Sequence, residues 1–280
     1  NTEHWKSIAS SIEKNYTEYD GFVILHGSDT MSYTASALSF MLENLSKPVI
    51  FTGSQLPIGD LRTDAKENLI TSVQLAALHT KGVAVIREVG LYFEYKLYRA
   101  NRTTKINAEH FEAFSSMNYP PLAESGVHLK VFEENLMPAT KAPFAVHTIL
   151  DSRVTILKIF PGMHSSVVKG ILELPDLKGI VLETFGAGNA PTESWLLEAL
   201  QAAINRGIHI VNVTQCSGGS VLMGRYETSD ALLKMPLING RDITTEAAIT
   251  KLMYLLGKGE EASNFKLSFE TPIRGEMALF

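Results

Sequence analysis

The sequence contains a single cysteine, Cys216, among 280 residues. An intrachain disulfide is therefore excluded, and a lone cysteine is most often a small buried side chain in a reducing compartment. The sequence also has no run of about 18 apolar residues, so no transmembrane helix is expected. Clusters of lysine and arginine are missing and the net charge is −5. We therefore expect a protein that binds neither nucleic acids nor membranes.

Patterns that bind cofactors are missing as well. No grouping of histidine, cysteine and aspartate has the spacing of a zinc site, and no Walker pattern occurs. Residues 186–190, GAGNA, are too short for the glycine fingerprint of dinucleotide-binding proteins, because no further glycine stands at the required offset before a helix. We predict that the protein uses neither a metal nor a cofactor.

Short apolar runs alternate with segments of helical periodicity. Phe22–Leu25 and residues 47–53 have the composition of buried strands, and residues 35–45 between them carry apolar side chains at helical spacing. A strand–helix–strand unit of this length implies parallel strands joined by a right-handed crossover. Residues 65–78 predict the next helix, whose inward side chains are expected to be Leu69, Val73 and Ala76 or Ala77.

The second half of the sequence repeats this plan. Strand-like residues 178–186 and 208–216 flank a helical segment, and another helical pattern lies near residue 250. Strands that alternate with helices predict an α/β fold with a mostly parallel, doubly wound sheet. We expect domains at residues 1–139 and 154–280, joined by a linker at residues 140–153 where the periodicity is lost.

Polar residues follow two of the predicted strands at their carboxyl ends, where doubly wound sheets bind ligands. Residues 26–30, HGSDT, follow the first strand, and Ser54 follows the second. Serine, aspartate and threonine are all preferred N-cap residues, so this cluster could simply cap the next helix. Capping accounts for one such residue and not for three in a row. Both interpretations, a helix cap and a functional site, stay open on this pattern alone.

Lys105 could complete such a site. It follows two threonines in the segment YRANRTTK, and a lysine in this setting is usually exposed to solvent. If Lys105 instead lies against Asp29, the pair could take up a proton from a neighbouring hydroxyl. A serine or threonine needs activation of this kind before it can take part in nucleophilic chemistry.

Several segments together resemble the bacterial L-asparaginases, most closely their cytoplasmic type I group. These segments are HGSDTM, LSFMLENL, KPVI, TGSQ, NRTTK, GNAP and TQC, and the resemblance covers essentially the whole chain. It implies an amidohydrolase of the cytoplasm that converts L-asparagine to L-aspartate and ammonia without a metal or cofactor. It also implies a larger N-terminal and a smaller C-terminal α/β domain, and a homotetramer assembled as a dimer of dimers.

The resemblance also implies roles for individual residues. Ser28, Asp29 and Lys105 match a catalytic group of the family, in which Lys105 keeps Asp29 ionised and Asp29 orients the substrate's ammonium. Ser54 matches a substrate-contacting position, and Gly27 helps to shape the substrate loop. The family has threonine where this chain has Ser28. Because serine lacks the methyl that restricts χ1, we expect its hydroxyl to be less firmly positioned.

Three further segments of the family do not occur in the sequence. These are a TGGTI motif with the attacking threonine, a loop tyrosine, and a DSSD-type segment that holds the substrate's α-amino and carboxylate groups. A parallel sheet without its first strand leaves buried backbone groups unpaired, at about 1–3 kcal/mol each. We therefore expect these residues to belong to a longer polypeptide or to be completed by a separate chain.

Two other functions stay open beside asparagine hydrolysis. The subunit that deamidates glutamine in tRNA-dependent amidotransferases shares this core, and a non-catalytic module that binds asparagine or aspartate would have the same loops. Some type I asparaginases are also activated by asparagine bound between subunits. The resemblance makes Cys216 a candidate allosteric residue, although Glu183 stands where those enzymes have a basic residue.

Overall fold

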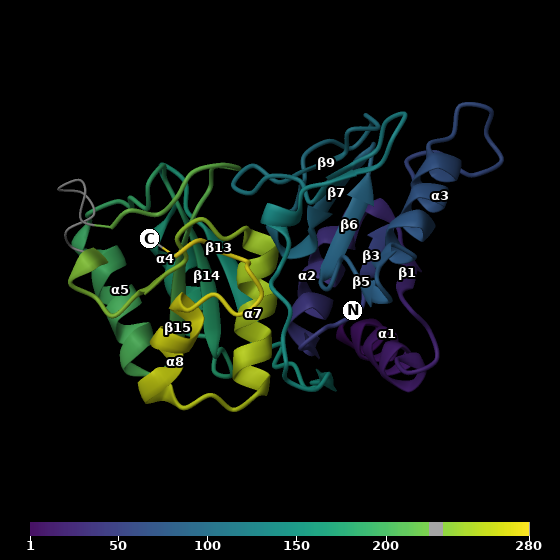
Figure 1. Ribbon diagram of the computed structural model, residues 1–280. Helices are drawn as coiled ribbons and strands as arrows, with labels where there is room; N and C mark the ends of the chain where they lie inside the picture. The colour runs from purple at the N-terminus through teal and green to yellow at the C-terminus, as the bar shows by residue number, and fades with distance from the viewer. Residues whose placement is uncertain (224–231, 280) are drawn as a thin grey trace. The chain divides into compact units, whose positions relative to one another are not determined.

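The computed structural model describes residues 1–223 and 232–279 and contains two compact units, Asn1–Thr148 and Ile149–Phe280 (Figure 1). Each unit has its own sheet. The stretch expected to be a linker is divided between them: β12 (Ala145–Val146) pairs with β2 (Leu42–Glu43) in the first unit, whereas Asp151 donates its N–H to the Met253 carbonyl in the second.

The first unit is built on a six-stranded mixed sheet. Strands β1, β3 and β6 are parallel, and β7, β10 and β11 continue the sheet in antiparallel pairs. In sheet order the strands are β1 (Phe22–Leu25), β3 (Val49–Thr52), β6 (Val89–Phe93), β7 (Lys96–Arg99), β10 (Ala123–Glu124) and β11 (Lys130–Val131). The predicted α/β class and the first two predicted strands are confirmed.

The smaller elements of this unit form two hairpins and three 3₁₀ turns. The hairpins are β4–β5 (His79–Thr80 and Val83–Ala84) and β8–β9 (Thr104–Lys105 and Phe114–Ser115), and the turns are η1 (Ser28–Thr30), η2 (Ala100–Arg102) and η3 (Glu133–Asn135).

Three helices pack on this sheet: α1 (Thr2–Asn15), α2 (Met31–Met41) and α3 (Ala65–Ala76). Helix α2 starts four residues earlier than expected and ends at Met41. For α3 the predicted inward face is wrong at Val73, which is exposed, and confirmed at Ala76; the buried side chains are Asn68, Thr71, Ser72, Leu75 and Ala76. Hydropathy misplaced this face because polar residues on it find partners inside; for instance, Asn68 donates to the Gly53 carbonyl at 2.9 Å.

Helices α2 and α3 cover opposite faces of the sheet (Figure 1). On one face, Leu75 and Ala76 of α3 pack in a core cluster with Ile50 and Tyr92. The chain steps in one direction from β1 to β3 to β6. The connection from β1 to β3 and the connection from β3 to β6 pass over opposite faces of the sheet, so they have opposite handedness. One of these two connections is therefore left-handed, whereas nearly all connections between parallel strands are right-handed.

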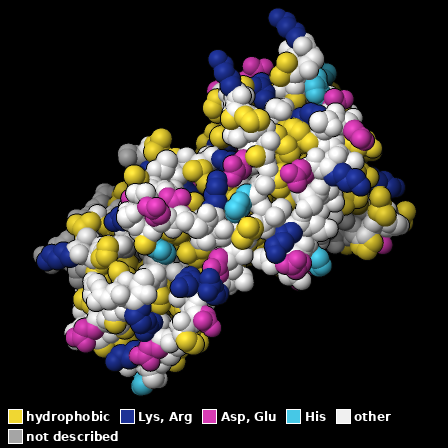
Figure 2. All heavy atoms as spheres, turned by 90° about the horizontal axis from the view of Figure 1, so that it is seen from below, with side chains coloured by type: hydrophobic (Ala, Val, Ile, Leu, Met, Phe, Trp, Pro, Cys, Tyr) yellow, Lys and Arg dark blue, Asp and Glu magenta, His cyan; other side chains and the backbone are white. Residues whose placement is uncertain are grey.

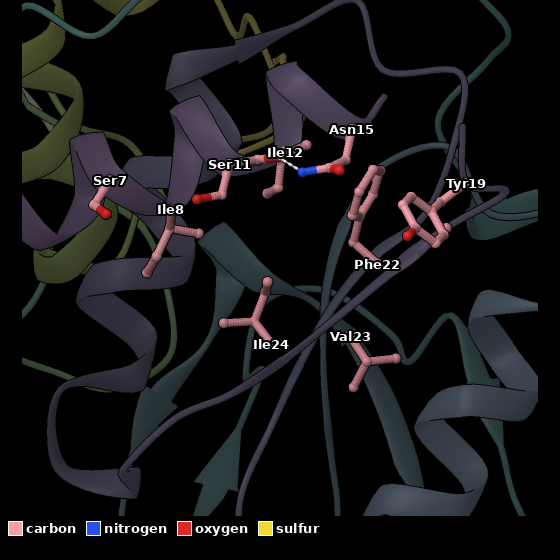
Figure 3. Close-up of a pocket in the computed structure, with 10 residues that line it drawn as sticks. Ser7, Ile8, Ser11, Ile12, Asn15, Tyr19, Phe22, Val23 and Ile24 are labelled. Atoms are coloured by element: carbon pink, nitrogen blue, oxygen red, sulfur yellow. Dashed lines mark hydrogen bonds between the residues drawn. The ribbon is translucent and has the colours of Figure 1, made fainter. Parts of the chain in front are cut away.

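Strand β1 is an edge strand in the described part of the chain, paired only with β3. Its open side is bordered by α1, and the two elements line a groove of about 460 Å³ (Figure 3). Ile8 and Ile12 of α1 and Ile24 of β1 are among its apolar lining residues. Successive backbone groups of a strand point to alternate sides. Since the N–H groups of Phe22 and His26 donate toward β3, those of Val23 and Leu25 are directed to the groove side.

The second unit contains a fully parallel four-stranded sheet in the order β13, β14, β15, β16. Helices α4 and α5 share a core cluster on one face, whereas α7 approaches the other face so closely that a Cβ at Gly179 would lie 2.7 Å from Leu252 Cδ2. The elements are β13 (Val154–Lys158), α4 (Ser165–Leu172), β14 (Gly179–Thr184), α5 (Ser194–Asn205), β15 (His209–Thr214), β16 (Ile238–Asn239), α7 (Thr245–Gly257) and α8 (Ala262–Glu270).

A fully buried ion pair holds the end of the chain against α7. Lys251 on α7 pairs with Glu276, and neither side chain is exposed. The ammonium also donates to the carbonyls of Phe269 and Thr271, and the carboxylate accepts from the N–H groups of Ile273 and Arg274. Burial lowers the pKa of Lys251, while the charge of Glu276 opposes that shift. The pair thus ties residues 269–276 to the helix.

Replacing Lys251 by methionine is expected to lower the free energy of unfolding of the second unit by about 3–5 kcal/mol, because Glu276 then remains buried without its counter-charge. The matched control is Lys266→Met on α8. Lys266 is half exposed and forms only an i,i+4 pair with Glu270, so this change should cost at most about 0.5 kcal/mol. Urea denaturation measures both changes, and equal losses would contradict the assignment.

Candidate active site

The carboxyl ends of β1 and β3 meet closely, as the sequence predicted. His26 donates its N–H to the Thr52 carbonyl at 2.9 Å. A Cβ built on Gly53 would lie only 2.2 Å from the His26 carbonyl oxygen, so only glycine fits there. This contact sets the loop of residues 26–30 beside the loop of residues 53–55.

The polar cluster after β1 places Thr30 at the N-cap of α2, but no side-chain capping bond is formed there. Ser28–Thr30 forms the 3₁₀ turn η1, whose N-cap position is Gly27, and the N-cap of α2 is Thr30; neither position makes a side-chain capping bond. The side chains turn to a lysine instead. Lys105 Nζ donates to Ser28 Oγ at 2.9 Å and to Asp29 Oδ1 at 2.7 Å. The three residues predicted to act together are therefore in direct contact.

Lys105 is positioned by the β8–β9 hairpin, and a buried hydrogen bond of Thr103 holds the start of this hairpin against α2. It lies opposite Phe114 in the antiparallel pair, and its side chain is only 16% exposed. Two residues earlier, Thr103 donates its hydroxyl to the Ala100 carbonyl at 2.7 Å. Because that proton is already used, the 3.0 Å contact between Thr103 and Ser32 has Ser32 as the donor. This bond joins the strand of Lys105 to the first turn of α2.

Lys105 favours the ionised form of Asp29. The hydrogen bond from Lys105, followed by its positive charge, lowers the pKa of Asp29 below the ordinary value of 3.8. Asp29 is otherwise open to solvent, with 94% of its side chain exposed. The pair is thus exposed on the carboxylate side, where a cationic ligand could approach, and Asp29 is ionised at neutral pH.

Gln55 belongs to this site and was not assigned a role from the sequence. Its Oε1 accepts the hydroxyl proton of Ser28 at 2.9 Å, and its Nε2 donates to the carbonyls of Ala108 and His110 at 3.2 and 3.0 Å. Its backbone N–H donates to the carboxylate of Asp64 at 3.0–3.1 Å. The one signal in the sequence was that Gln55 stands within the TGSQ segment, directly after Ser54.

The remaining predicted residues are placed less tightly. Ser54 is half-buried between Gly53 and Gln55 at the end of β3. Gly27 has an extended backbone, and a Cβ there would meet no atom within 4 Å, so the position does not require glycine for local steric reasons. Cys216 lies after β15 in the second unit and is exposed, which corrects the expectation of a buried thiol. Its N–H donates to Thr214 Oγ1 at 3.1 Å.

Residues 1–223 and 232–279 include no cluster of three or more metal-ligating side chains. Within the same residues, none of the helices has the length and apolarity needed to cross a bilayer. On the face shown in Figure 2, acidic and basic side chains are interspersed rather than gathered into one basic patch.

The Asp29–Lys105 pair predicts a specific titration. The pKa of Asp29 is lowered in the folded protein. The contribution of the pair to the free energy of unfolding is therefore complete above pH 3.8, and it is lost as the pH falls through the lowered pKa. Carbon-detected NMR should place the Asp29 midpoint below 3.8, and Lys105→Met should move it back toward that value. Asp151, whose pKa is lowered by Arg153, is the control and should not move. An Asp29 midpoint unchanged by the substitution would contradict the pairing.

Comparisons with known proteins identify the family of the chain. A family model described as "Asparaginase, N-terminal" matches residues 1–137, and one described as "Glutaminase/Asparaginase C-terminal domain" matches residues 153–269. The chain is 46% identical over 275 residues to L-asparaginase 1 of Escherichia coli, which covers 98% of this chain and 80% of that protein.

Two further relatives bear on the fold and on the alternatives. The crystal structure of L-asparaginase I from Vibrio cholerae superposes with a TM-score of 0.92 at 43% identity, covering 100% of this chain and 82% of that one. A glutamyl-tRNA(Gln) amidotransferase protein of Pyrococcus abyssi is 31% identical over 279 residues, covering 98% of this chain and 63% of that protein. Both halves of the sequence and the fold thus lead to one conclusion: the chain belongs to the asparaginase family.

Proposed function

We propose that this protein is an L-asparaginase that hydrolyses the side-chain amide of L-asparagine to L-aspartate and ammonia. The observation that carries the proposal is the contact of Lys105 with both Ser28 and Asp29 at the carboxyl end of β1. The names of the E. coli and V. cholerae relatives support the same chemistry.

Each member of the group has a distinct part in this proposal. Asp29, ionised and open to solvent, is suited to bind the α-ammonium of the substrate. Lys105 keeps Asp29 ionised and donates a hydrogen bond to Ser28. Ser28 orients water or a hydroxyl near the amide carbonyl. Attack on that carbonyl develops an oxyanion, and one well-placed hydrogen-bond donor at such a position contributes about 3–4 kcal/mol to the transition state.

The attacking hydroxyl is proposed to enter from the open edge of β1. A strand that pairs with β1 in parallel would run along the α1–β1 groove (Figure 3). Because parallel strands end at the same edge of a sheet, it would end near the loop that follows β1. The groove side of Val23 and Leu25 supplies the backbone donors and acceptors for such a pairing. A segment in that position would bring a second hydroxyl to the face of the site that Ser28 and Asp29 border.

The two alternatives are separated by simple measurements. Release of ammonia from free L-asparagine without tRNA favours the amidase over a glutamine-deamidating component of an amidotransferase. The greater similarity to the E. coli enzyme than to the amidotransferase protein also favours it. Binding of asparagine or aspartate with no turnover would instead indicate a non-catalytic module.

Cytoplasmic location and assembly as a dimer of dimers are part of the same proposal.

Replacing Lys105 by alanine is expected to lower kcat for L-asparagine by about 10²-fold or more, because Asp29 and Ser28 lose the cation that orders them. Ammonia release measures the rate. Lys96→Ala on β7 is the control, since that lysine lies on another hairpin of the same unit, and it should retain nearly the full rate. A Lys105→Ala variant as fast as the Lys96→Ala variant would refute the assignment.

Regulation through Cys216 gives a separate prediction. Glu183, at the position where a basic residue is expected for activation, accepts a hydrogen bond from Thr245 at 2.6 Å and lies 3.4 Å from Lys158. This negative group does not favour a second asparagine carboxylate, so we expect a hyperbolic dependence of rate on asparagine concentration. A sigmoidal curve that becomes hyperbolic in Cys216→Ala would overturn this expectation and assign Cys216 to an allosteric site.

A further inference from the structure

The hydrogen-bond polarity at Ser28 is fixed by its neighbours. The amide of Gln55 faces two backbone carbonyls, those of Ala108 and His110, and only its NH₂ end can donate to them. Its oxygen must therefore face Ser28, where it can only accept. The hydroxyl proton of Ser28 consequently points to Gln55, and a lone pair of the same oxygen receives the proton of Lys105.

This arrangement assigns Ser28 the role of an acceptor rather than that of an attacking group. A hydroxyl has one proton and two lone pairs, so Ser28 keeps one lone pair for water or substrate. Neither neighbour can take the proton of Ser28, because an amide oxygen is a very weak base and an ammonium has no lone pair. The remaining lone pair suits Ser28 to orient a water or hydroxyl proton.

Serine gives no internal restraint on this orientation. A β-branched threonine has a restricted χ1, whereas the rotamers of serine are more nearly equal. Here the restraint comes from Gln55, which is itself anchored at three points: its Nε2 on two carbonyls, and its backbone N–H on Asp64. The rotamer of Ser28 is thus restrained by a neighbouring side chain and not by the shape of Ser28 itself.

We propose that Gln55 is a positioning residue that fixes the rotamer and proton direction of Ser28, in place of the methyl group that a threonine would provide. The proposal rests on the proposed function, since Ser28 is taken to act on L-asparagine. The competing role is structural: Gln55 would merely anchor residues 106–113, the loop of the β8–β9 hairpin.

A double-mutant cycle separates the two roles. Gln55→Leu is expected to lower kcat by roughly tenfold to 10²-fold with a smaller change in KM, because Ser28 then samples several rotamers. Ser28→Thr alone supplies the reference rate for the double variant, since it keeps the hydroxyl and adds the methyl that restricts χ1. In the double variant the threonine methyl restores the restraint, so most of the lost kcat should return. An anchoring role would leave the double variant as slow as Gln55→Leu.

Gln55→Glu provides a second variant should the leucine variant fail to fold. An ionised glutamate still accepts from Ser28 but cannot donate to the two carbonyls, whereas the protonated acid can donate to one of them. A positioning role therefore expects kcat of Gln55→Glu at neutral pH to stay well above that of Gln55→Leu, because the contact with Ser28 is kept while the anchoring bonds are lost. A kcat as low as that of Gln55→Leu would overturn the proposal and indicate anchoring. Gln201→Leu on α5, which loses only a bond to Asn205, controls for the substitution itself.

A crystal structure of Gln55→Leu gives a readout that does not depend on turnover. The proposal expects Ser28 Oγ to leave the 2.9 Å contact with Lys105 or to occupy more than one rotamer. An unchanged, single Ser28 rotamer would overturn it, whatever the activity. If the wild type itself releases no ammonia from L-asparagine, the proposed function fails, and the Ser28 rotamer still decides the role of Gln55.

Discussion

The ammonium group of Lys105 connects the parts of the first unit on which the site depends. It joins Ser28 and Asp29, at the end of β1, to a hairpin that lies 76 residues further along the chain. Two other contacts make this meeting possible. Gly53 allows the ends of β1 and β3 to approach each other, and the buried bond from Ser32 to Thr103 holds the hairpin strand against α2. Without this cation, the exposed carboxylate of Asp29 would have no partner to set its direction or its pKa.

The second unit also contains a pair of a lysine ammonium and a carboxylate, and there the pair stabilises the fold. Lys251 and Glu276 are both fully buried, and their remaining donors and acceptors are satisfied by backbone groups of residues 269–274. That pair has no side open to a ligand, so it stabilises the packing of the chain end on α7. Lys105 and Asp29 differ in that the lysine is mostly buried and the carboxylate is almost fully exposed. The uneven burial leaves the Asp29 carboxylate open to a ligand, whereas the Glu276 carboxylate is closed to one.

In the candidate site, two neighbouring side chains orient the hydroxyl group of Ser28. Lys105 supplies one hydrogen bond to Ser28, and Gln55 accepts the other. The hydroxyl is therefore oriented by one side chain from the loop after β3 and one from the β8–β9 hairpin rather than by its own shape. In the proposed reaction this group directs water or a second hydroxyl, and the open edge of β1 is the place from which a second hydroxyl could arrive.

The sequence by itself determined the α/β class, the strands at Phe22–Leu25 and near residue 50, and the grouping of Ser28, Asp29 and Lys105. Hydrophobic periodicity and polar residues at strand ends are local signals, and together with the family resemblance they were sufficient. The tertiary structure decided the rest. It moved the inward face of α3 from Val73 toward Asn68 and Thr71, because these two find polar partners that no periodicity reports. It showed that Thr30 stands at the N-cap of α2 without a side-chain capping bond, exposed Cys216, and brought Gln55 to Ser28. A hydrogen bond between residues 27 positions apart depends on how two strands end side by side, and only the folded chain fixes that geometry.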